Sequence, residues 1–171
     1  MKISNKILTL CVPIFFFHLA QASSDVPFAS QMGCYQTTSI KVDGKDEKPA
    51  QLYIGNTQDT GDTILKGWYR SSDCNELFYG TYFYFFWSSG GQQTNGDVTV
   101  SVAQVGQYST VNGTEKWDVS YPFCRFGHVV PTKSTISMAN TNHGGFHITT
   151  FVAWDNYKHE IEADVIPISC L

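Results

Sequence analysis

The stretch at residues 77–87, LFYGTYFYFFW, is the strongest indication of the fold class of this chain. Eight of its eleven residues are aromatic and none is charged. Aromatic side chains favour the pleated, half-buried surface of a β-strand, and side chains alternate between the two faces of a strand. The more apolar face is expected to point into the core and carries Leu77, Tyr79, Thr81, Phe83, Phe85 and Trp87. The other face carries Phe78, Gly80, Tyr82, Tyr84 and Phe86. The stretch therefore predicts a central strand whose second face is either a packed layer or a ligand platform.

Short strand patterns separated by turn signals continue on both sides of this stretch. Strands are expected at residues 35–42, 50–56, 63–70, 97–105, 134–138, 146–154 and 159–168, and loops at 88–96 and 122–133. Asn112-Gly113 predicts a tight hairpin, because both positions of the favoured turn need a positive φ. No window shows a helical period. The pattern predicts an all-β fold, and we expect an antiparallel β-sandwich of the jelly-roll or immunoglobulin-like type.

The N-terminal residues have the organisation of a secretory signal peptide. Lys2 and Lys6 precede an apolar run over residues 7–20, and Ala20-Gln21-Ala22 offers a small-x-small cleavage site. The apolar run is too short for a confident membrane span, and no later stretch is long enough for one. We expect cleavage after residue 22 and a secreted protein, extracellular or periplasmic.

The remaining chain has the size of one domain. We expect a flexible lead-in over residues 23–33 and a single monomeric domain over residues 34–171. Without residues 1–22 the chain has nine basic and fifteen acidic residues and no basic cluster. This balance argues against nucleic acid or an anionic membrane surface as the partner.

Four cysteines follow the predicted signal peptide: Cys34, Cys74, Cys124 and Cys170. An even number without metal-type spacing predicts two disulfides in an exported chain, and four cysteines allow three pairings. We favour Cys34 with Cys170, which joins the two ends of the domain, and Cys74 with Cys124. The bridge between the ends closes a long loop and would contribute about 4 kcal/mol in the chain-entropy account.

The aromatic residues are the first candidates for a binding site. Trp68 and Arg70 share one face of the expected strand at residues 63–70, and pairing with the aromatic strand would place them beside Tyr82, Tyr84 and Phe86. Flat rings beside a few hydrogen-bonding groups suit a carbohydrate, because ring faces contact C–H edges and polar neighbours bind hydroxyls. Core packing is the competing interpretation of the same rings.

Neither a metal nor another cofactor is expected. His143 and His147 lie four residues apart around a glycine turn, and His128 or Asp155 would have to complete a site. Zinc needs three or four ligands with supporting contacts, and only two are local here. Exposed loop histidines are the simpler interpretation.

Acidic residues give no clear catalytic signal. Glu160, Glu162 and Asp164 alternate with apolar residues, which predicts a solvated strand face rather than a calcium site. The chain lacks a Gly-x-Ser-x-Gly elbow, a phosphate loop and a His-Glu-x-x-His motif. A glycoside hydrolase would need two facing carboxylates, for which Glu76 with Asp73 or Asp118 are the candidates. A non-enzymatic protein is the favoured interpretation.

The C-terminal stretch resembles the closing hairpin of the ML family, secreted β-sandwiches that hold lipids between their sheets. Val152-Ala153-Trp154-Asp155, a polar turn and Val165-Ile166-Pro167-Ile168 carry the resemblance, whereas the close-set cysteine pairs of that family are absent. The resemblance implies a lipid ligand in an internal apolar cavity lined by the aromatic residues.

The sequence as a whole predicts a secreted binding protein, in the manner of an exported effector, that recognises cell-surface carbohydrate through its aromatic face. A lipid carrier and a secreted glycoside hydrolase are the alternatives. A host protein is a further class of partner, because protein interfaces are also rich in Tyr and Trp.

Overall fold

The structure is a computed structural model that describes residues 26–56, 80–89, 92–102, 106–125 and 128–170. These residues form one short 3-10 turn, η1 (Ala29–Gln31), and ten strands. The strands are β1 (Gly33–Val42), β2 (Lys45–Asp46), β3 (Gln51–Asn56), β4 (Gly80–Ser89), β5 (Gln92–Val102), β6 (Gln107–Val111), β7 (Thr114–Arg125), β8 (His128–Asn140), β9 (Phe146–Trp154) and β10 (Tyr157–Ile168). None of the described residues forms a helix long and apolar enough to cross a membrane.

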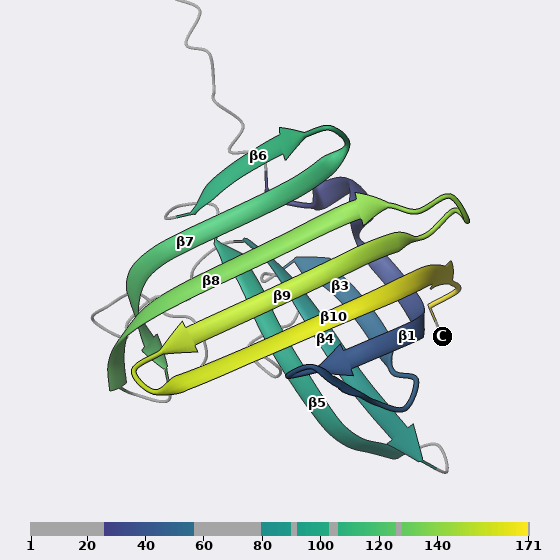
Figure 1. The fold of residues 1–171 in the computed structure, drawn as a ribbon, viewed down its shortest axis with the longest axis horizontal. Helices are drawn as coiled ribbons and strands as arrows, with labels where there is room; N and C mark the ends of the chain where they lie inside the picture. The colour runs from purple at the N-terminus through teal and green to yellow at the C-terminus, as the bar shows by residue number, and fades with distance from the viewer. Residues whose placement is uncertain (1–25, 57–79, 90–91, 103–105, 126–127, 171) are drawn as a thin grey trace, which may run out of the picture.

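The strands join into one antiparallel sheet in the order β5-β4-β3-β1-β10-β9-β8-β7-β6, with β2 beside β1. Figure 1 shows β7 to β10 and β1 as a front layer, with β3, β4 and β5 passing behind it at a steep angle. The predicted antiparallel all-β class is confirmed. The sandwich is not confirmed, because the described strands form a single sheet that folds over on itself. β1 links the front and back parts, and its ladder with β10 contains an irregularity between Thr37 and Ser39 that favours local bending.

Tight turns connect several of the antiparallel neighbours. Asn112 and Gly113 have φ of 51° and 77° and join β6 to β7, as predicted. Asp43 and Gly44 have φ of 50° and 76° and join β1 to β2 in the same manner. A two-residue connection with positive φ matches the right-handed twist of the flanking strands.

Two predicted loops are wrong. Residues 88–96 were expected to be a loop because they are polar and rich in glycine, but β4 continues to Ser89 and β5 begins at Gln92. Residues 122–133 were also expected to be a loop, but they lie in β7 and β8, apart from 126 and 127, which are outside the described residues. Pro122 lies opposite Pro131, so the two missing N–H donors fall at one point of the ladder.

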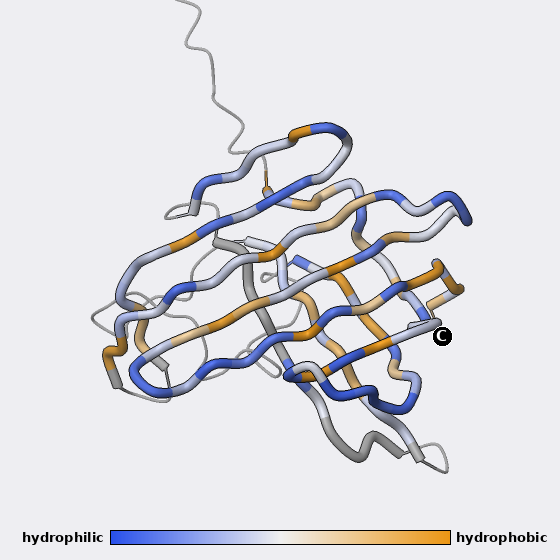
Figure 2. Tube along the Cα trace, in the orientation of Figure 1, coloured by the Kyte–Doolittle hydropathy of each residue, from blue (hydrophilic) through white to orange (hydrophobic). Residues whose placement is uncertain are grey.

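The core lies between the front layer and the back strands. Trp117 of β7 is fully buried, and Phe83 and Phe85 of β4 are buried at 0% and 1% exposure. Burial alternates along the strands of the front layer, and Figure 2 shows the matching alternation of hydrophobic and hydrophilic residues. Thr81 is buried as well. The predicted core face of the aromatic strand is thus confirmed for Thr81, Phe83 and Phe85.

Of the expected lead-in at residues 23–33, the structure describes residues from Val26 onward, which include η1 and the first residue of β1, Gly33. Phe28 is 1% exposed and contacts Phe83 and Tyr108 edge-on at ring-centroid distances of 5.2 and 5.6 Å. The Pro27 carbonyl accepts a hydrogen bond from the buried Thr81 hydroxyl. The Phe28 ring and the Pro27 carbonyl thus join this segment to β4 and β6.

One disulfide is described, and it joins Cys34 of β1 to Cys170 beyond β10. This pairing of the two ends is the predicted one. Cys124 is buried in β7, whereas Cys74 lies outside the described residues, so the second predicted pair stays a prediction.

An ion-pair cluster fastens the back of the sheet to the front. His159 of β10 lies with its Nε2 2.5 Å from an Asp97 carboxylate oxygen of β5, and its Nδ1 lies 3.1 Å from Asp43 in the β1–β2 turn. Asp43 also accepts the backbone N–H of Glu160 at 2.9 Å. The bond to Asp97, aided by Asp43, raises the pKa of His159 from 6.5 to about 9 against the opposing effect of burial. We call His159, Asp43 and Asp97 the histidine clasp.

Candidate functional site

The second face of the aromatic strand carries the candidate binding residues. β4 pairs with β3 on one side and with β5 on the other. Tyr84 lies opposite Tyr53 and Phe86 lies opposite Gln51. Trp68 and Arg70 lie outside the described residues, so their place beside these rings stays a prediction.

Tyr82 does not present its ring to solvent. It is 1% exposed and contacts Tyr53 edge-on at a ring-centroid distance of 5.6 Å. Its opposite neighbour is Gly55, where an added Cβ would come within 2.7 Å of the Tyr82 hydroxyl. The missing side chain of Gly55 therefore lets the tyrosine lie flat against β3, and Tyr82 supports the neighbouring rings rather than exposing a surface of its own.

Tyr84 and Phe86 are half-buried and line an open hollow of about 460 Å³. Their rings are stacked at 5.4 Å with an interplanar angle of 24°. The other lining residues come from β1, from β3 and from the C-terminal end: Cys34, Tyr35, Gln51, Leu52, Tyr53, Ile168, Ser169 and Cys170. We call this the aromatic hollow. It brings together two of the five predicted binding residues.

The aromatic hollow also contains groups that can form hydrogen bonds. The amide of Gln51 has no hydrogen-bond partner within the part of the chain that the structure describes, and the exposed Ser169 adds a hydroxyl. Burial raises the pKa of Tyr84, so its hydroxyl stays protonated and can donate. Rings beside an unpaired amide and hydroxyls are an arrangement that can hold a neutral polar ligand with flat apolar faces.

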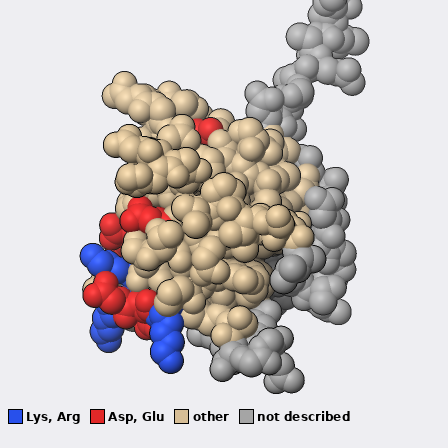
Figure 3. All heavy atoms as spheres, turned by 90° about the vertical axis from the view of Figure 1, so that its right-hand side faces the viewer, with Lys and Arg blue, Asp and Glu red and all other residues tan. Residues whose placement is uncertain are grey.

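The surroundings of the hollow are weakly charged. The end of the molecule that carries the C-terminus faces the viewer in Figure 3, where charged side chains gather on one flank and most of the described surface is uncharged. Among the described residues, no Asp, Glu, Lys or Arg lines the hollow. A neutral ligand fits this environment better than an ionic one.

Sequence reasoning missed Tyr53 and Gln51. The alternation of Gln51-Leu52-Tyr53-Ile54-Gly55 places the first, third and fifth residues on one strand face, so the signal was present. Alternation within one strand does not show which strand pairs with the aromatic strand, so the pattern alone does not bring Tyr53 and Gln51 to the site.

The other predicted candidates are not brought into a site. No group of three or more His, Cys, Asp or Glu suitable for a metal is found among the described residues. His147 instead contacts Asp164 at 2.8 Å, and hydrogen bonds from His147 and Ser39 lower the pKa of that carboxyl. Glu162 lies opposite Lys41 of β1, as expected for a solvated face, although β10 is a central strand of the sheet.

The carboxylates considered for hydrolysis are not assembled either. Asp118 is bound to Lys116 at 2.8 Å and accepts the Thr135 hydroxyl at 2.8 Å. Partial burial raises its pKa, but these hydrogen bonds outweigh the burial and lower it overall. Glu76 and Asp73 lie outside the described residues.

Comparison of the chain with protein-family models, with curated proteins and with solved structures finds no match. The functional argument therefore depends on the geometry of the hollow alone.

Proposed function

We propose that the chain is a secreted, non-enzymatic protein that binds carbohydrate in the aromatic hollow. The ligand would be a neutral or weakly polar sugar whose C–H face lies on Tyr84 or Phe86. Gln51 and Ser169 would bind its hydroxyls. A disulfide between the ends of the domain is compatible with an oxidising, extracytoplasmic compartment.

The observation that supports this proposal is the stacked, half-buried pair Tyr84 and Phe86 beside the Gln51 amide, which has no hydrogen-bond partner among the described residues. A packed outer layer would bury both rings as deeply as Tyr82. Their partial exposure leaves ring surface for a ligand, and the fixed stack lowers the conformational cost of binding.

The alternative of a lipid in an internal cavity has less support. The residues that the ML resemblance rests on do form a hairpin, β9–β10. However, the space between the front layer and the back strands contains large side chains, among them Trp117, Phe83 and Phe123, each with 0% exposure. Close packing of this kind favours a ligand at the surface.

The hydrolase alternative also has less support. A glycosidase needs two carboxyl groups across the scissile bond, and the aromatic hollow is lined by neither Asp nor Glu. The hollow is therefore equipped to bind a sugar rather than to cleave it.

The test is a glycan array with the folded, non-reduced protein, followed by calorimetric titration of the best ligand. Tyr84→Leu and Phe86→Leu keep apolar volume but remove the ring face. Because an aromatic contact is worth about 0.5–1.5 kcal/mol beyond its area, each variant should weaken binding about threefold to tenfold. Tyr157→Ala, which removes an exposed tyrosine from β10, is the control and should bind as the wild type does.

The proposal fails if no glycan binds, or if the two leucine variants bind as tightly as the wild type while remaining folded. An apolar molecule extracted from the purified, denatured protein would support the lipid alternative instead.

A further inference from the structure

A row of residues crosses the outer surface of the front layer at its end near the β9–β10 turn. Ser120 of β7 lies opposite Lys133 of β8, Lys133 lies opposite Ala153 of β9, and Ala153 lies opposite Lys158 of β10. Neighbouring strands are about 4.8 Å apart, so the backbones of the two lysines are about 10 Å apart. Only the methyl group of Ala153 stands between them.

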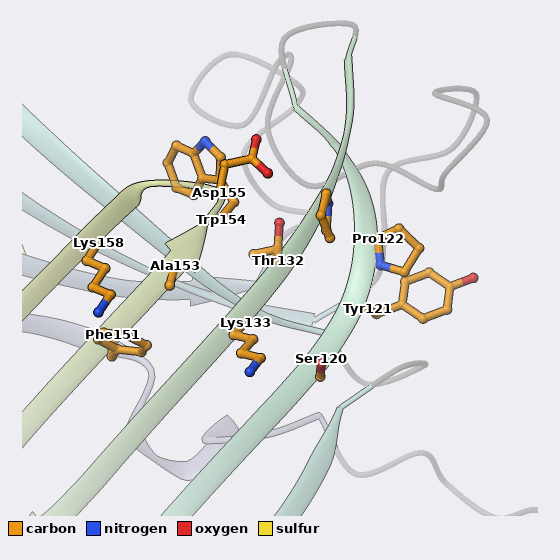
Figure 4. Close-up of a pocket in the computed structure, with 11 residues that line it drawn as sticks. Ser120, Tyr121, Pro122, Thr132, Lys133, Phe151, Ala153, Trp154, Asp155 and Lys158 are labelled. Atoms are coloured by element: carbon orange, nitrogen blue, oxygen red, sulfur yellow. The ribbon is translucent and has the colours of Figure 1, made fainter.

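These residues line an open hollow of about 630 Å³. Figure 4 shows the side chains of Lys133 and Lys158 extending toward the same side of the hollow as the ring of Phe151. Phe151 is half-buried and lies two residues before Ala153 on β9, on the same face of the strand. Tyr121, Pro122, Pro131 and Trp154 provide further apolar lining. We call this the basic hollow.

The charges of the two lysines are not neutralised. Within the described part of the chain, neither Lys133 nor Lys158 has an ion-pair partner. Asp118, one row along the sheet, is already bound to Lys116 at 2.8 Å and to Thr135. The acidic side chain that lines the hollow is Asp155, which lies with Trp154 at the end of the hollow away from the two ammonium groups in Figure 4.

The exposed Glu160 is the remaining acidic side chain to consider. It follows Lys158 by two residues on β10. It therefore lies opposite Phe151 of β9, whereas Lys158 lies opposite Ala153. It does not line the hollow. Two cations therefore remain beside an apolar floor in a chain of net charge −4.

We propose that the basic hollow binds a carboxylate-bearing ring, the chemistry of a uronic acid. The carboxylate would lie between Lys133 and Lys158, where charge-assisted hydrogen bonds are available from both ammonium groups. The apolar face of the ring would rest on Phe151, and Ser120 would bind a ring hydroxyl. The small side chain of Ala153 provides the necessary space.

This inference does not rest on the proposed function, because the basic hollow shares no residue with the aromatic hollow. The two sites also differ in chemistry. Among the described residues, the aromatic hollow has no charged lining residue, whereas the basic hollow has two lysines without an ion-pair partner. A variant in one hollow should leave binding in the other unchanged.

The test is a titration of the folded, non-reduced protein with trigalacturonate at low ionic strength, with the methyl ester of the same trimer as the neutral probe. Saturable binding of the acid and at least tenfold weaker binding of the ester are expected. Lys133→Gln with Lys158→Gln should weaken binding of the acid at least tenfold. Ala153→Leu, which fills the space but keeps both charges, should also weaken it severalfold. Raising the salt concentration should weaken binding as well, since exposed charges are screened.

The matched control is Lys41→Gln with Lys45→Gln, which removes two exposed lysines from β1 and β2 and changes the net charge equally. It should bind the acid as the wild type does, and so should Tyr84→Leu from the aromatic hollow. The inference is overturned if the acid does not bind, if the ester binds equally well, or if both lysine pairs have the same effect. The inference is also overturned if the acid changes amide chemical shifts only at residues other than 120–122, 131–135 and 151–158.

Discussion

The histidine clasp predicts a loss of stability in mildly alkaline solution. His159 has 15% of its side chain exposed and lies between Asp97 at 2.5 Å and Asp43 at 3.1 Å. Its two partners belong to the back strand β5 and to the β1–β2 turn, which are distant along the sheet order. The charged histidine therefore links β10 to β5, which are not neighbours in the sheet, whereas the Asp43 N–H already donates a backbone hydrogen bond to the Glu160 carbonyl at 2.8 Å.

The size of the effect follows from the pKa of His159, which rises from 6.5 to about 9 on folding. Each pKa unit corresponds to about 1.4 kcal/mol, so the upper limit is about 3 kcal/mol. Asp43 is half-exposed, and solvent screening weakens its share of the interaction. We expect the clasp to contribute about 1.5 kcal/mol to the free energy of unfolding at pH 6.

The sign of the pH dependence is fixed by the raised pKa. Between pH 6.5 and 9 the folded protein binds more protons at His159 than the unfolded chain does, so the free energy of unfolding falls as the pH rises. The full contribution is present below pH 6.5 and is lost as the pH passes about 9. At acidic pH the clasp weakens again when Asp43 is protonated. The bond from the Glu160 N–H lowers the pKa of Asp43, so this happens below its usual range.

The assay is urea unfolding of the non-reduced protein at pH 6, 7.5 and 9.5, followed by tryptophan fluorescence. The wild type should lose about 1.5 kcal/mol between pH 6 and 9.5, whereas His159→Gln should lose much less over this range. His143→Gln removes an exposed turn histidine and should follow the wild type. If His159→Gln lost as much stability with rising pH as the wild type, the clasp would not be the origin of the pH dependence.

Two further predictions concern the turns and the disulfide. Gly113→Ala places a side chain at φ 77° with no atom within 4 Å of the new Cβ, so it should cost about 1–2 kcal/mol of unfolding free energy through backbone strain alone. An unchanged urea midpoint would contradict this turn assignment. Replacing Cys34 and Cys170 by serine opens a loop of 136 residues and should lower the free energy of unfolding by about 4–5 kcal/mol in the chain-entropy account. Equal stability of this variant and the wild type would show that the bridge does not restrict the unfolded chain as assumed.

Local patterns in the sequence predicted the strands and the tightest turns. The strand expected at 146–154 coincides with β9, and Asn112-Gly113 forms the expected hairpin turn. Both signals depend only on residues within one strand or turn. The loop expected at 88–96 is wrong because its polar residues are paired across the β4–β5 hairpin. The loop expected at 122–133 is wrong because β7 and β8 continue through it and bury side chains such as Phe123, which is 0% exposed.

Strand pairing was harder to predict, and the candidate site depends on it. Tyr84 and Phe86 were identified from alternation within one strand, but Tyr53 and Gln51 belong to a neighbour that the sequence does not specify. The basic hollow is a more extreme case. Lys133, Ala153 and Lys158 come together only through two strand registers, and no spacing in the chain indicates this.

Two glycines on the neighbouring strands help to explain why the aromatic hollow exists at this position. An added Cβ at Gly96 of β5 would come within 2.5 Å of the Tyr84 hydroxyl, and one at Gly55 would come within 2.7 Å of the Tyr82 hydroxyl. Each tyrosine therefore lies across a glycine of an adjacent strand instead of standing upright from the sheet. Because a shift of one residue would move each side chain to the other face, these two contacts are compatible with only one register of β3, β4 and β5. The same register sets Gln51 opposite Phe86, which is already the neighbour of Tyr84 along β4. The contacts that flatten the tyrosines therefore also place the stacked pair and its polar neighbour in one hollow.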